Sequence, residues 1–192
     1  MTEEHSALQK RKQELRTKML AMRRALSSDI IEEWSVGLAN QIISLREYKT
    51  AKRIMAFLAM KGEANLDRFI RYALQEGKEI YIPVCKQNRE MDAGRLTDMN
   101  GLQKGAMGLR NIPAGYDISC PEDLDLVFIP AVACSYEHER LGMGAGYYDR
   151  FLSRIPHEKR VAVIWDFQIE SSIPVEPHDE KIAKIVTEKR II

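Results

Sequence analysis

The sequence predicts an α/β fold: a doubly wound, mainly parallel sheet with helices on both faces and a small antiparallel excursion. Helical patterns alternate with compact apolar runs, and such alternation is typical of βαβ units with parallel strands. Five of these runs are expected to be strands: residues 52–60, 79–85, 124–134, 160–166 and 184–188. Residues 86–123 instead hold several glycines and prolines between short apolar runs, which indicates antiparallel strands and loops. A chain of 192 residues fits one domain, expected here to span residues 1–192.

The first two helices follow from apolar periodicity and from an end signal. Apolar residues recur at helical spacing and predict an amphipathic helix over residues 4–26: Leu8, Leu15, Met19, Met22 and Leu26. Asp29 with Glu32 resembles a capping box, and it is expected to open a second helix that runs toward Leu45.

Two further helices are expected later in the chain. Asn65 can cap a helix that runs through Leu74, and Gly77 stands where such a helix should stop. Another helix is expected over residues 147–154. Between them, residues 124–134 give the strongest strand signal, because a nearly unbroken apolar run suits a sheet covered on both faces.

The composition excludes several classes of protein. Basic residues number 29 and acidic residues 28, and this balance argues against a dedicated nucleic-acid surface. No stretch approaches the roughly 20 apolar residues of a membrane span, and the charged N-terminus lacks the apolar core of a signal peptide. Cys85, Cys120 and Cys134 form no CxxC pair, so neither a disulfide framework nor a structural zinc site is expected. The prediction is a cytoplasmic protein with reduced thiols and without an obligate protein partner.

The most informative segment is RLGMGAGYYDR, residues 140–150. Gly142, Gly144 and Gly146 alternate in it, which frees the backbone to adopt positive φ and to approach a ligand closely. Because a helix is expected to begin just after them, the N–H groups of this loop suit the phosphates of a nucleotide. Asp149 would then meet a phosphate-bound magnesium ion, which favours carboxylate and phosphate oxygens together.

Other interpretations of this segment were weighed against a phosphate loop. A Walker loop fails, because the position five after Gly142 is Tyr147 instead of a glycine. A dinucleotide fingerprint, GxGxxG, fails at its third glycine, where Tyr147 or Asp149 stands, although Asp166 has the spacing of a ribose-binding acid. The segment can also be a plain loop, in which Tyr147 and Tyr148 only anchor the helix against the sheet.

Basic residues on the first helix are candidates for phosphate binding. Lys12 and Arg16 are one helical turn apart, and Arg23 lies further along. They flank the apolar stripe, so they can project past its edge toward a phosphate. The alternative is that they are ordinary charges on a solvated helix face.

Two acidic residues in loops are candidates for the site: one follows an expected strand, and the other precedes one. Glu63 comes after Gly62 and the strand expected to end at Met60, where its carboxylate can accept hydrogen bonds from N–H groups of a substrate. Asp179, in the segment PVEPHD before the last strand, is a candidate second acid beside magnesium. The alternatives are a local cap for Glu63 and an Asx turn for Asp179.

These residues resemble the 5-formyltetrahydrofolate cyclo-ligase family. The segment LGMGAGYYDRFL resembles the family's GxGxGYYD loop, and KQELR, residues 12–16, matches its N-terminal KxxLR motif. Smaller pieces fall in the family's order along almost the whole chain: Phe57, Leu58, Glu63, Met91, Ile112, Pro113, residues 124–126, Gln168 and the Pro-His-Asp segment.

The resemblance implies a two-sided site that uses ATP and Mg²⁺. The residues it implies for ATP are Lys12, Gln13, Glu14, Leu15, Arg16, Arg140, Leu141, Gly142, Met143, Gly144, Ala145, Gly146, Tyr147 and Tyr148. Of these it implies catalytic roles for Lys12, Arg16 and Tyr148. For the metal ion it implies Asp149 and, as a weaker match, Asp179. For the folate it implies Leu58, Glu63, Met91 and Tyr147, with Glu63 on the pterin side.

Three positions depart from the family pattern. Met143 stands where some members have a basic residue, and Ala183 replaces an acid often found four residues after the Asp179 position. Arg110 precedes Asn-Ile-Pro where some relatives have an aromatic residue. These departures concern details of the pocket and leave the reaction class unchanged.

The reaction that the resemblance implies is the conversion of 5-formyltetrahydrofolate, with or without a polyglutamate tail, to 5,10-methenyltetrahydrofolate. ATP would phosphorylate the formyl oxygen, and N10 would attack the activated carbon as phosphate departs. Two alternatives stay open at this point: a non-catalytic nucleotide- or folate-binding regulator with the same fold, and a Rossmann oxidoreductase.

Overall fold

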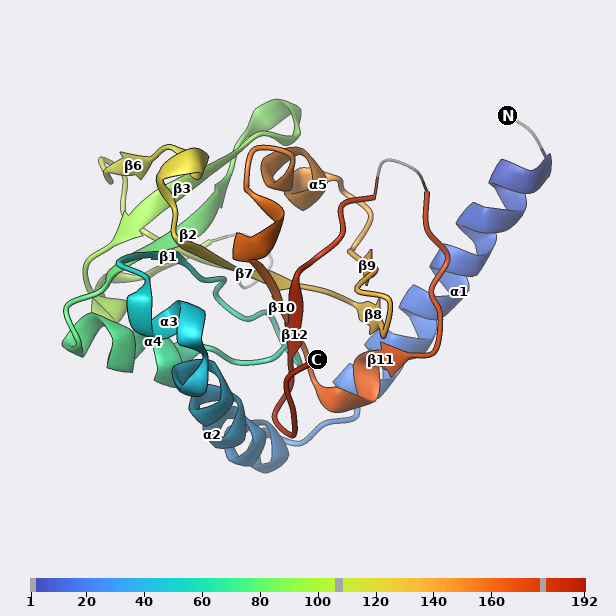
Figure 1. The fold of residues 1–192 in the computed structure, drawn as a ribbon, viewed down its shortest axis with the longest axis horizontal. Helices are drawn as coiled ribbons and strands as arrows, with labels where there is room; N and C mark the ends of the chain where they lie inside the picture. Colours follow the sequence, from blue (N-terminus) through green and yellow to red (C-terminus); the bar gives the residue numbers. More distant parts are fainter. Residues whose placement is uncertain (1–2, 106–108, 177–178) are drawn as a thin grey trace.

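A computed structural model describes residues 3–105, 109–176 and 179–192 (Figure 1). Its main sheet has seven strands, in the spatial order β12 (Lys184–Val186), β10 (Arg160–Val163), β7 (Leu126–Pro130), β1 (Arg53–Met55), β2 (Glu79–Cys85), β3 (Met91–Leu96) and β6 (Ile118–Ser119). The first five are mutually parallel, and β3 and β6 are antiparallel to their neighbours. The predicted mainly parallel sheet is therefore confirmed.

Helices cover both faces of this sheet, as predicted. Figure 1 shows α2 (Ser28–Ser44), α3 (Arg46–Thr50) and α4 (Asp67–Gln75) on one face and α5 (Tyr147–Leu152) on the other. Neighbouring strand residues point to opposite faces. Accordingly Ile54 packs into the core beneath α2 and α4, whereas Met55 packs into the core beneath α5.

A second, three-stranded sheet lies beside α1 (Glu3–Arg24) and has the order β11 (Ile169–Glu170), β8 (Ala133–Ser135) and β9 (Arg140–Leu141). Met19 of α1 is fully buried in a small core with residues from this sheet and its surroundings: Val132, Ala133, Leu141 and Ile173. Leu15 of α1 packs against the same core, whereas Lys12 and Arg23 are buried polar residues of this helix.

The strand predicted over residues 124–134 is in fact two strands in different sheets. β7 ends at Pro130 and β8 begins at Ala133, so that the chain leaves the main sheet between them. The Nε2 of buried Gln168 donates hydrogen bonds to the backbone oxygens of Ala131 (3.0 Å) and Val132 (2.7 Å). Burial of unpaired carbonyls is costly, and this amide satisfies the two that the break exposes.

Several predicted boundaries are wrong. Ser27 caps α2 by accepting a hydrogen bond from the N–H of Ile30 (3.3 Å), so the expected capping box at Asp29 and Glu32 is not used. Four elements are shorter than predicted: β1 spans 53–55, β10 ends at 163, β12 ends at 186 and α5 ends at 152.

The expected helix stop is confirmed, because Gly77 after α4 has a φ of 74°. Asn65 lies one residue before the position expected of a cap: the N-cap of α4 is Leu66, and the Oδ1 of Asn65 accepts a hydrogen bond from the N–H of Asp67 (3.0 Å). The antiparallel excursion consists of β3, β6 and the hairpin β4 (Gln103–Lys104) with β5 (Arg110–Asn111). Within the described part of the chain, no helix has the length and apolar character needed to cross a membrane.

Candidate functional site

The glycine loop connects β9 to α5 and is open to solvent. Gly144 and Gly146 have φ values of 92° and 75°, a conformation that favours glycine because it lacks a Cβ. Gly142 serves differently: a Cβ there would lie 2.8 Å from the Nη1 of Arg140. Met143 projects outward and is 54% exposed. The loop backbone is thus available to a ligand, whereas α5, with six residues, adds only a short helix end.

Arg140 forms a buried cation beneath this loop. Its Nη2 is ion-paired with the Oδ1 of Asp149, and its Nη1 donates to the backbone oxygen of Pro130 (3.5 Å). Its guanidinium lies 5.9 Å from the centroid of the Tyr148 ring, within reach of a cation–π contact. Arg140 therefore fixes the start of α5 and orients Asp149.

Helix α1 presents a row of cations to the site. Lys12, Arg16, Met19 and Arg23 are spaced by four, three and four residues and share one face of the helix. Lys12 is only 4% exposed, so a solvated-face interpretation of Lys12 is wrong. Gln13 of the KQELR motif, together with Glu14, is exposed and lies off this face.

Two members of this row contact loops of the site. The Nε of Arg16 donates to the backbone oxygen of Gly142 (2.9 Å), and the Arg16 guanidinium lies 3.3 Å from where a Gly144 Cβ would be. The Nζ of Lys12 is ion-paired with Glu176 (2.7 Å) and Asp179 (2.6 Å). The helix thereby joins the glycine loop to the segment that precedes β12.

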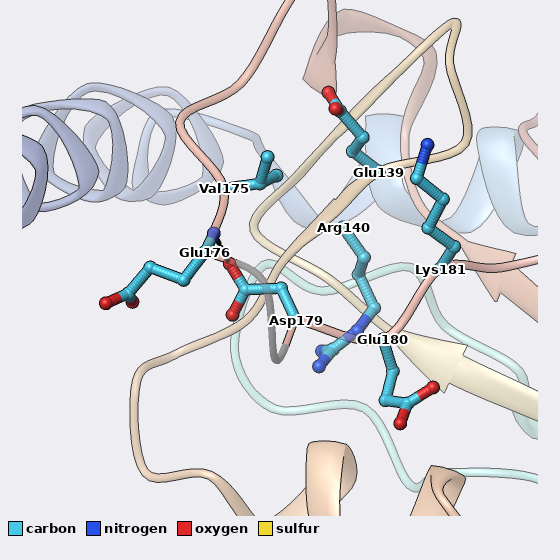
Figure 2. Close-up of a pocket in the computed structure, with 7 residues that line it drawn as sticks. All are labelled: Glu139, Arg140, Val175, Glu176, Asp179, Glu180 and Lys181. Atoms are coloured by element: carbon cyan, nitrogen blue, oxygen red, sulfur yellow. Dashed lines mark hydrogen bonds between the residues drawn. The ribbon is translucent and has the colours of Figure 1, made fainter.

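A pocket of about 440 Å³ opens beside the glycine loop. It is lined by Glu139, Arg140, Val175, Glu176, Asp179, Glu180 and Lys181. Figure 2 shows the Arg140 side chain beside the chain segment that carries Asp179 and Glu180. The Oδ2 of Asp179 also accepts a hydrogen bond from the N–H of Glu176 (2.7 Å), so Asp179 is held by the backbone of Glu176 as well as by Lys12. Residues 177–178 of this segment lie outside the described residues.

Glu63 lies in a tight turn after β1. Its Oε2 accepts a hydrogen bond from the N–H of Met60 (2.9 Å), and its Oε1 lies 3.0 Å from the Nη2 of Arg23. Gly62, with a φ of 80°, accepts a hydrogen bond from the indole N–H of buried Trp165 (3.0 Å) through its backbone oxygen. The local-cap interpretation of Glu63 is thus confirmed, and the carboxylate is held rigidly as well.

Tyr148 is the second residue of α5 and directly follows the glycine loop. Its hydroxyl is buried and has no hydrogen-bond partner among the described residues. Burial raises the pKa of Tyr148 above its usual range, and the negative charge of nearby Glu63 raises it further. An unpaired buried hydroxyl is costly in a folded protein, so a ligand or water that pairs with it would bind more favourably.

The remaining residues expected at the folate side lie at the same edge of the sheet. Met91 begins β3 opposite Cys85, the last residue of β2, and belongs to the core against which Tyr147 and Tyr148 pack. Leu58 follows β1 and packs against the core beneath α2 and α4. Parallel sheets collect ligands beyond the carboxyl ends of their strands, which is where these side chains lie.

The acidic residues of the site suit a magnesium ion that binds together with a nucleotide. They suit less well an ion that is coordinated by protein side chains alone. Within residues 3–105, 109–176 and 179–192, no three His, Cys, Asp or Glu side chains converge as a ligand set. Mg²⁺ is commonly held by one or two carboxylates together with substrate phosphates and water. Asp149 fits this arrangement because its side chain is partly exposed. Its Oδ1 is paired with Arg140, so Oδ2 can bind the ion. Asp179 fits less well, since its Oδ2 already accepts from Lys12 and from the N–H of Glu176.

Comparison with known families identifies the chain. A model of the 5-formyltetrahydrofolate cyclo-ligase family matches residues 8–188, which include the α1 cations, the Glu63 turn, the glycine loop and the Asp179 segment. The chain belongs to this cyclo-ligase family. The oxidoreductase alternative is therefore set aside, in agreement with the failed dinucleotide fingerprint.

Cyclo-ligases from distant organisms are similar over almost their whole length. The mouse 5-formyltetrahydrofolate cyclo-ligase is 31% identical over 189 residues, covering 92% of this chain and 93% of the mouse protein. The Escherichia coli K12 protein of the same name is 27% identical over 177 residues, covering 88% and 96% respectively. The NMR structure of Aquifex aeolicus 5,10-methenyltetrahydrofolate synthetase superposes with a TM-score of 0.82 at 34% identity, covering 94% of this chain and 91% of that one.

Some contacts of this cyclo-ligase site were missed from the sequence. Glu176 was not singled out, although it shares Lys12 with Asp179. Arg110, which departs from the family pattern, forms a paired hydrogen bond with Asp67 at the start of α4 (2.5 and 2.8 Å). Arg23 was grouped with Lys12 and Arg16 as a candidate for phosphate binding, yet it is paired with Glu63. Its position on the Lys12 face, at a spacing of eleven residues, is the signal that could have assigned it.

Proposed function

We propose that this chain converts 5-formyltetrahydrofolate to 5,10-methenyltetrahydrofolate, consuming ATP and releasing ADP and phosphate. The observation that carries the proposal is the glycine loop together with the cations that contact it: Arg16 donates to its Gly142 oxygen, and Arg140 lies beneath it next to the Tyr148 ring. The Glu63 carboxylate, held by Met60 and Arg23, lies in the turn after β1. Family membership supports the same reaction.

On the phosphate side, positive charge is concentrated around the glycine loop. Arg16 contacts the glycine loop, and its guanidinium can clamp phosphate oxygens in bidentate fashion. Lys12 is held by Glu176 and Asp179, which take two of the three N–H donors of its ammonium and leave one for a phosphate oxygen. Arg140 supplies a further fixed charge beneath the loop. Together these groups would position and neutralise the triphosphate.

Mg²⁺ is proposed as the cofactor, with Asp149 as its carboxylate ligand and Asp179 as a weaker candidate. When bound, the ion neutralises charge that develops on the phosphates during transfer. Asp149 can contribute Oδ2 while Arg140 holds Oδ1, so the carboxylate keeps its orientation.

On the folate side, Glu63 presents an acceptor for paired N–H donors. A pterin carries neighbouring N–H groups that one carboxylate can accept together. Leu58 and Met91 provide apolar surface at the same edge of the sheet, and Tyr147 is fixed because its hydroxyl donates to the backbone oxygen of Lys86 (3.2 Å). A planar ring lodged here would lie near the Tyr148 hydroxyl.

The reaction needs activation because a formamide oxygen is a poor leaving group. The γ-phosphoryl group is transferred to the formyl oxygen, the bond to ADP breaks, and an iminophosphate forms. The N10 lone pair then attacks the activated carbon, phosphate departs with the former formyl oxygen, and N10 loses its proton. Positioning and charge neutralisation suffice for these steps, so no side-chain nucleophile is required.

A direct assay tests the proposal against the regulator alternative. The chain is incubated with 5-formyltetrahydrofolate and Mg-ATP, and methenyl product is followed by its ultraviolet absorbance. Product that depends on ATP and disappears with excess chelator supports a cyclo-ligase with a metal requirement. Binding of both ligands without turnover would support the regulator, and full activity in chelator would contradict the metal proposal.

A cytoplasmic location is proposed as well. The three thiols are free in the structure, which suits a reducing compartment.

A further inference from the structure

Arg23 forms a buried ion pair that packing alone does not explain. The side chain of Arg23 is 4% exposed and that of Glu63 is 10% exposed, with 3.0 Å between Nη2 and Oε1. Burying two charges costs desolvation energy that their attraction only partly offsets, so an apolar pair is often as stable. The Nε of Arg23 is also buried without a hydrogen-bond partner among the described residues. The pair is therefore a costly arrangement at a turn that faces the candidate site.

The two oxygens of Glu63 are held from different elements. Met60 donates its N–H to Oε2 from within the turn, and Arg23 approaches Oε1 from α1. An ionised carboxylate has about four acceptor positions, so both oxygens can still accept from a ligand. Arg23 consequently fixes the orientation of the carboxylate without using up its acceptor capacity.

The position of Arg23 is fixed by the backbone around it. A Cβ on Gly62 would lie 2.7 Å from the backbone oxygen of Arg23, so only glycine lets the turn approach α1 this closely. Trp165 anchors the turn from the sheet side through the backbone oxygen of Gly62. Arg23 also shares its helix face with Arg16, which contacts the glycine loop.

We infer that Arg23 is a positioning residue for folate recognition: it holds the Glu63 carboxylate in one orientation and balances its charge, so that the free lone pairs meet the pterin N–H groups. This inference rests on the proposed function, because it assigns Arg23 to the folate side of that site. Arg23 acts through Glu63 and makes no contact with the nucleotide.

The test uses four variants of the full chain: Arg23→Met, Arg23→Lys, Glu63→Gln and the double variant Arg23→Met/Glu63→Gln. Arg24→Met is the matched control, since Arg24 is the next residue of α1 and is exposed. Calorimetry measures the affinity for 5-formyltetrahydrofolate and for ATP separately. Arg23→Met should weaken folate binding roughly tenfold, within the range of coupling seen between contacting residues, and leave ATP binding within about twofold.

The double variant and the lysine variant decide the mechanism. In the Glu63→Gln background, Arg23→Met should weaken folate binding by less than about twofold more, because the group it positions is already altered. Arg23→Lys should recover part of the loss. If Arg23→Met does not fold, Arg23→Lys alone should still weaken folate binding selectively by roughly threefold, since an ammonium lacks the planar geometry of guanidinium.

Three results would overturn the inference. One is an equal loss of affinity for both ligands, which means that Arg23 only supports the fold. Another is a full additional loss in the Glu63→Gln background, and a third is unchanged folate binding in Arg23→Lys. If the proposed function is wrong, the unmodified chain will not bind 5-formyltetrahydrofolate at all. A double-mutant cycle on melting temperature would still report the coupling of Arg23 to Glu63 in that case.

Discussion

The two sides of the candidate site present different chemical groups to their ligands. On the phosphate side the ligand-facing surface is a backbone loop whose glycines have positive φ or no room for a side chain, supported by Arg16 and Arg140 from below. On the folate side a single carboxylate is held by one cation and one N–H group. The first side depends on backbone shape, and the second depends on the placement of one charge.

This difference teaches which changes each side should tolerate. Phosphate oxygens accept from many donors at once, so the loss of one donor is partly covered by the others. A pair of N–H donors on a pterin needs one carboxylate in one orientation, and at this turn that carboxylate is Glu63. Substitutions on the folate side should therefore be selective, and those on the phosphate side should be graded.

The largest effect is expected at Asp149, which is the proposed metal ligand. Asp149→Asn should lower metal-dependent turnover by about a hundredfold or more, comparable to the loss of one preorganised charge-stabilising group in an active site. The stability loss should be smaller, about 1–3 kcal/mol, because Arg140 loses a charged partner but keeps the Pro130 oxygen. Turnover and melting temperature are measured together.

Glu122→Gln is the control for Asp149→Asn, because Glu122 pairs with Arg154 at the surface, where an ion pair contributes little. A large stability loss at Asp149 with normal turnover in the folded fraction would make Asp149 a purely structural partner of Arg140.

Glu63→Gln should weaken binding of 5-formyltetrahydrofolate by roughly ten- to a hundredfold, since a charge-assisted hydrogen bond contributes about 1.5–3 kcal/mol. ATP affinity should change far less, because the phosphates are expected at the glycine loop. Glu79→Gln is the control. Glu79 is the first residue of β2, at the edge of the sheet away from the candidate site, so its substitution should change neither affinity. Calorimetry with each ligand separately checks this, and unchanged folate affinity would leave Glu63 with only its local capping role.

Arg16→Ala should raise the ATP concentration needed for half-maximal rate by roughly tenfold, the loss of one charge-assisted hydrogen bond. Folate affinity should stay nearly intact, because Arg16 contacts the glycine loop. Lys18→Ala is the control on the same helix, since Lys18 is exposed and pairs with Glu170 at the surface. Overlapping ATP titrations for Arg16→Ala and the unmodified chain would contradict a phosphate role.

The smallest effect is expected from a backbone change in the glycine loop. Gly144→Ala forces a side chain into a φ of 92° and places a Cβ 3.3 Å from the Arg16 guanidinium. Gly77→Ala is the matched control, because it has a φ of 74° with open space around it, so it isolates the strain of about 1–2 kcal/mol. Both variants should melt at lower temperature, but only Gly144→Ala should weaken ATP binding, by a fewfold. Equal ATP affinity in the two variants would mean that the loop shape does not matter for the nucleotide.

Local signals predicted much of the fold and part of the site. The alternation of strands and helices depends on short-range periodicity, and the glycine loop and the KQELR motif are continuous segments, so both were recognisable. What the sequence could not predict are contacts between distant segments. Arg23 meets Glu63 across 40 residues, and Lys12 meets Glu176 across 164 residues. The break between β7 and β8 was likewise hidden, because the run stays apolar while the side chain that satisfies its carbonyls, Gln168, is supplied from later in the chain.

The two sides have to meet at one atom, the formyl oxygen, and following that oxygen tests the account most directly. The unmodified chain is given 5-formyltetrahydrofolate labelled with oxygen-18 in the formyl group, together with unlabelled Mg-ATP in unlabelled water. Phosphoryl transfer to the formyl oxygen predicts inorganic phosphate that carries one heavy oxygen for each methenyl product formed. Unlabelled phosphate, with the heavy oxygen recovered in water, would contradict the proposed phosphoryl transfer and the joint site that it requires.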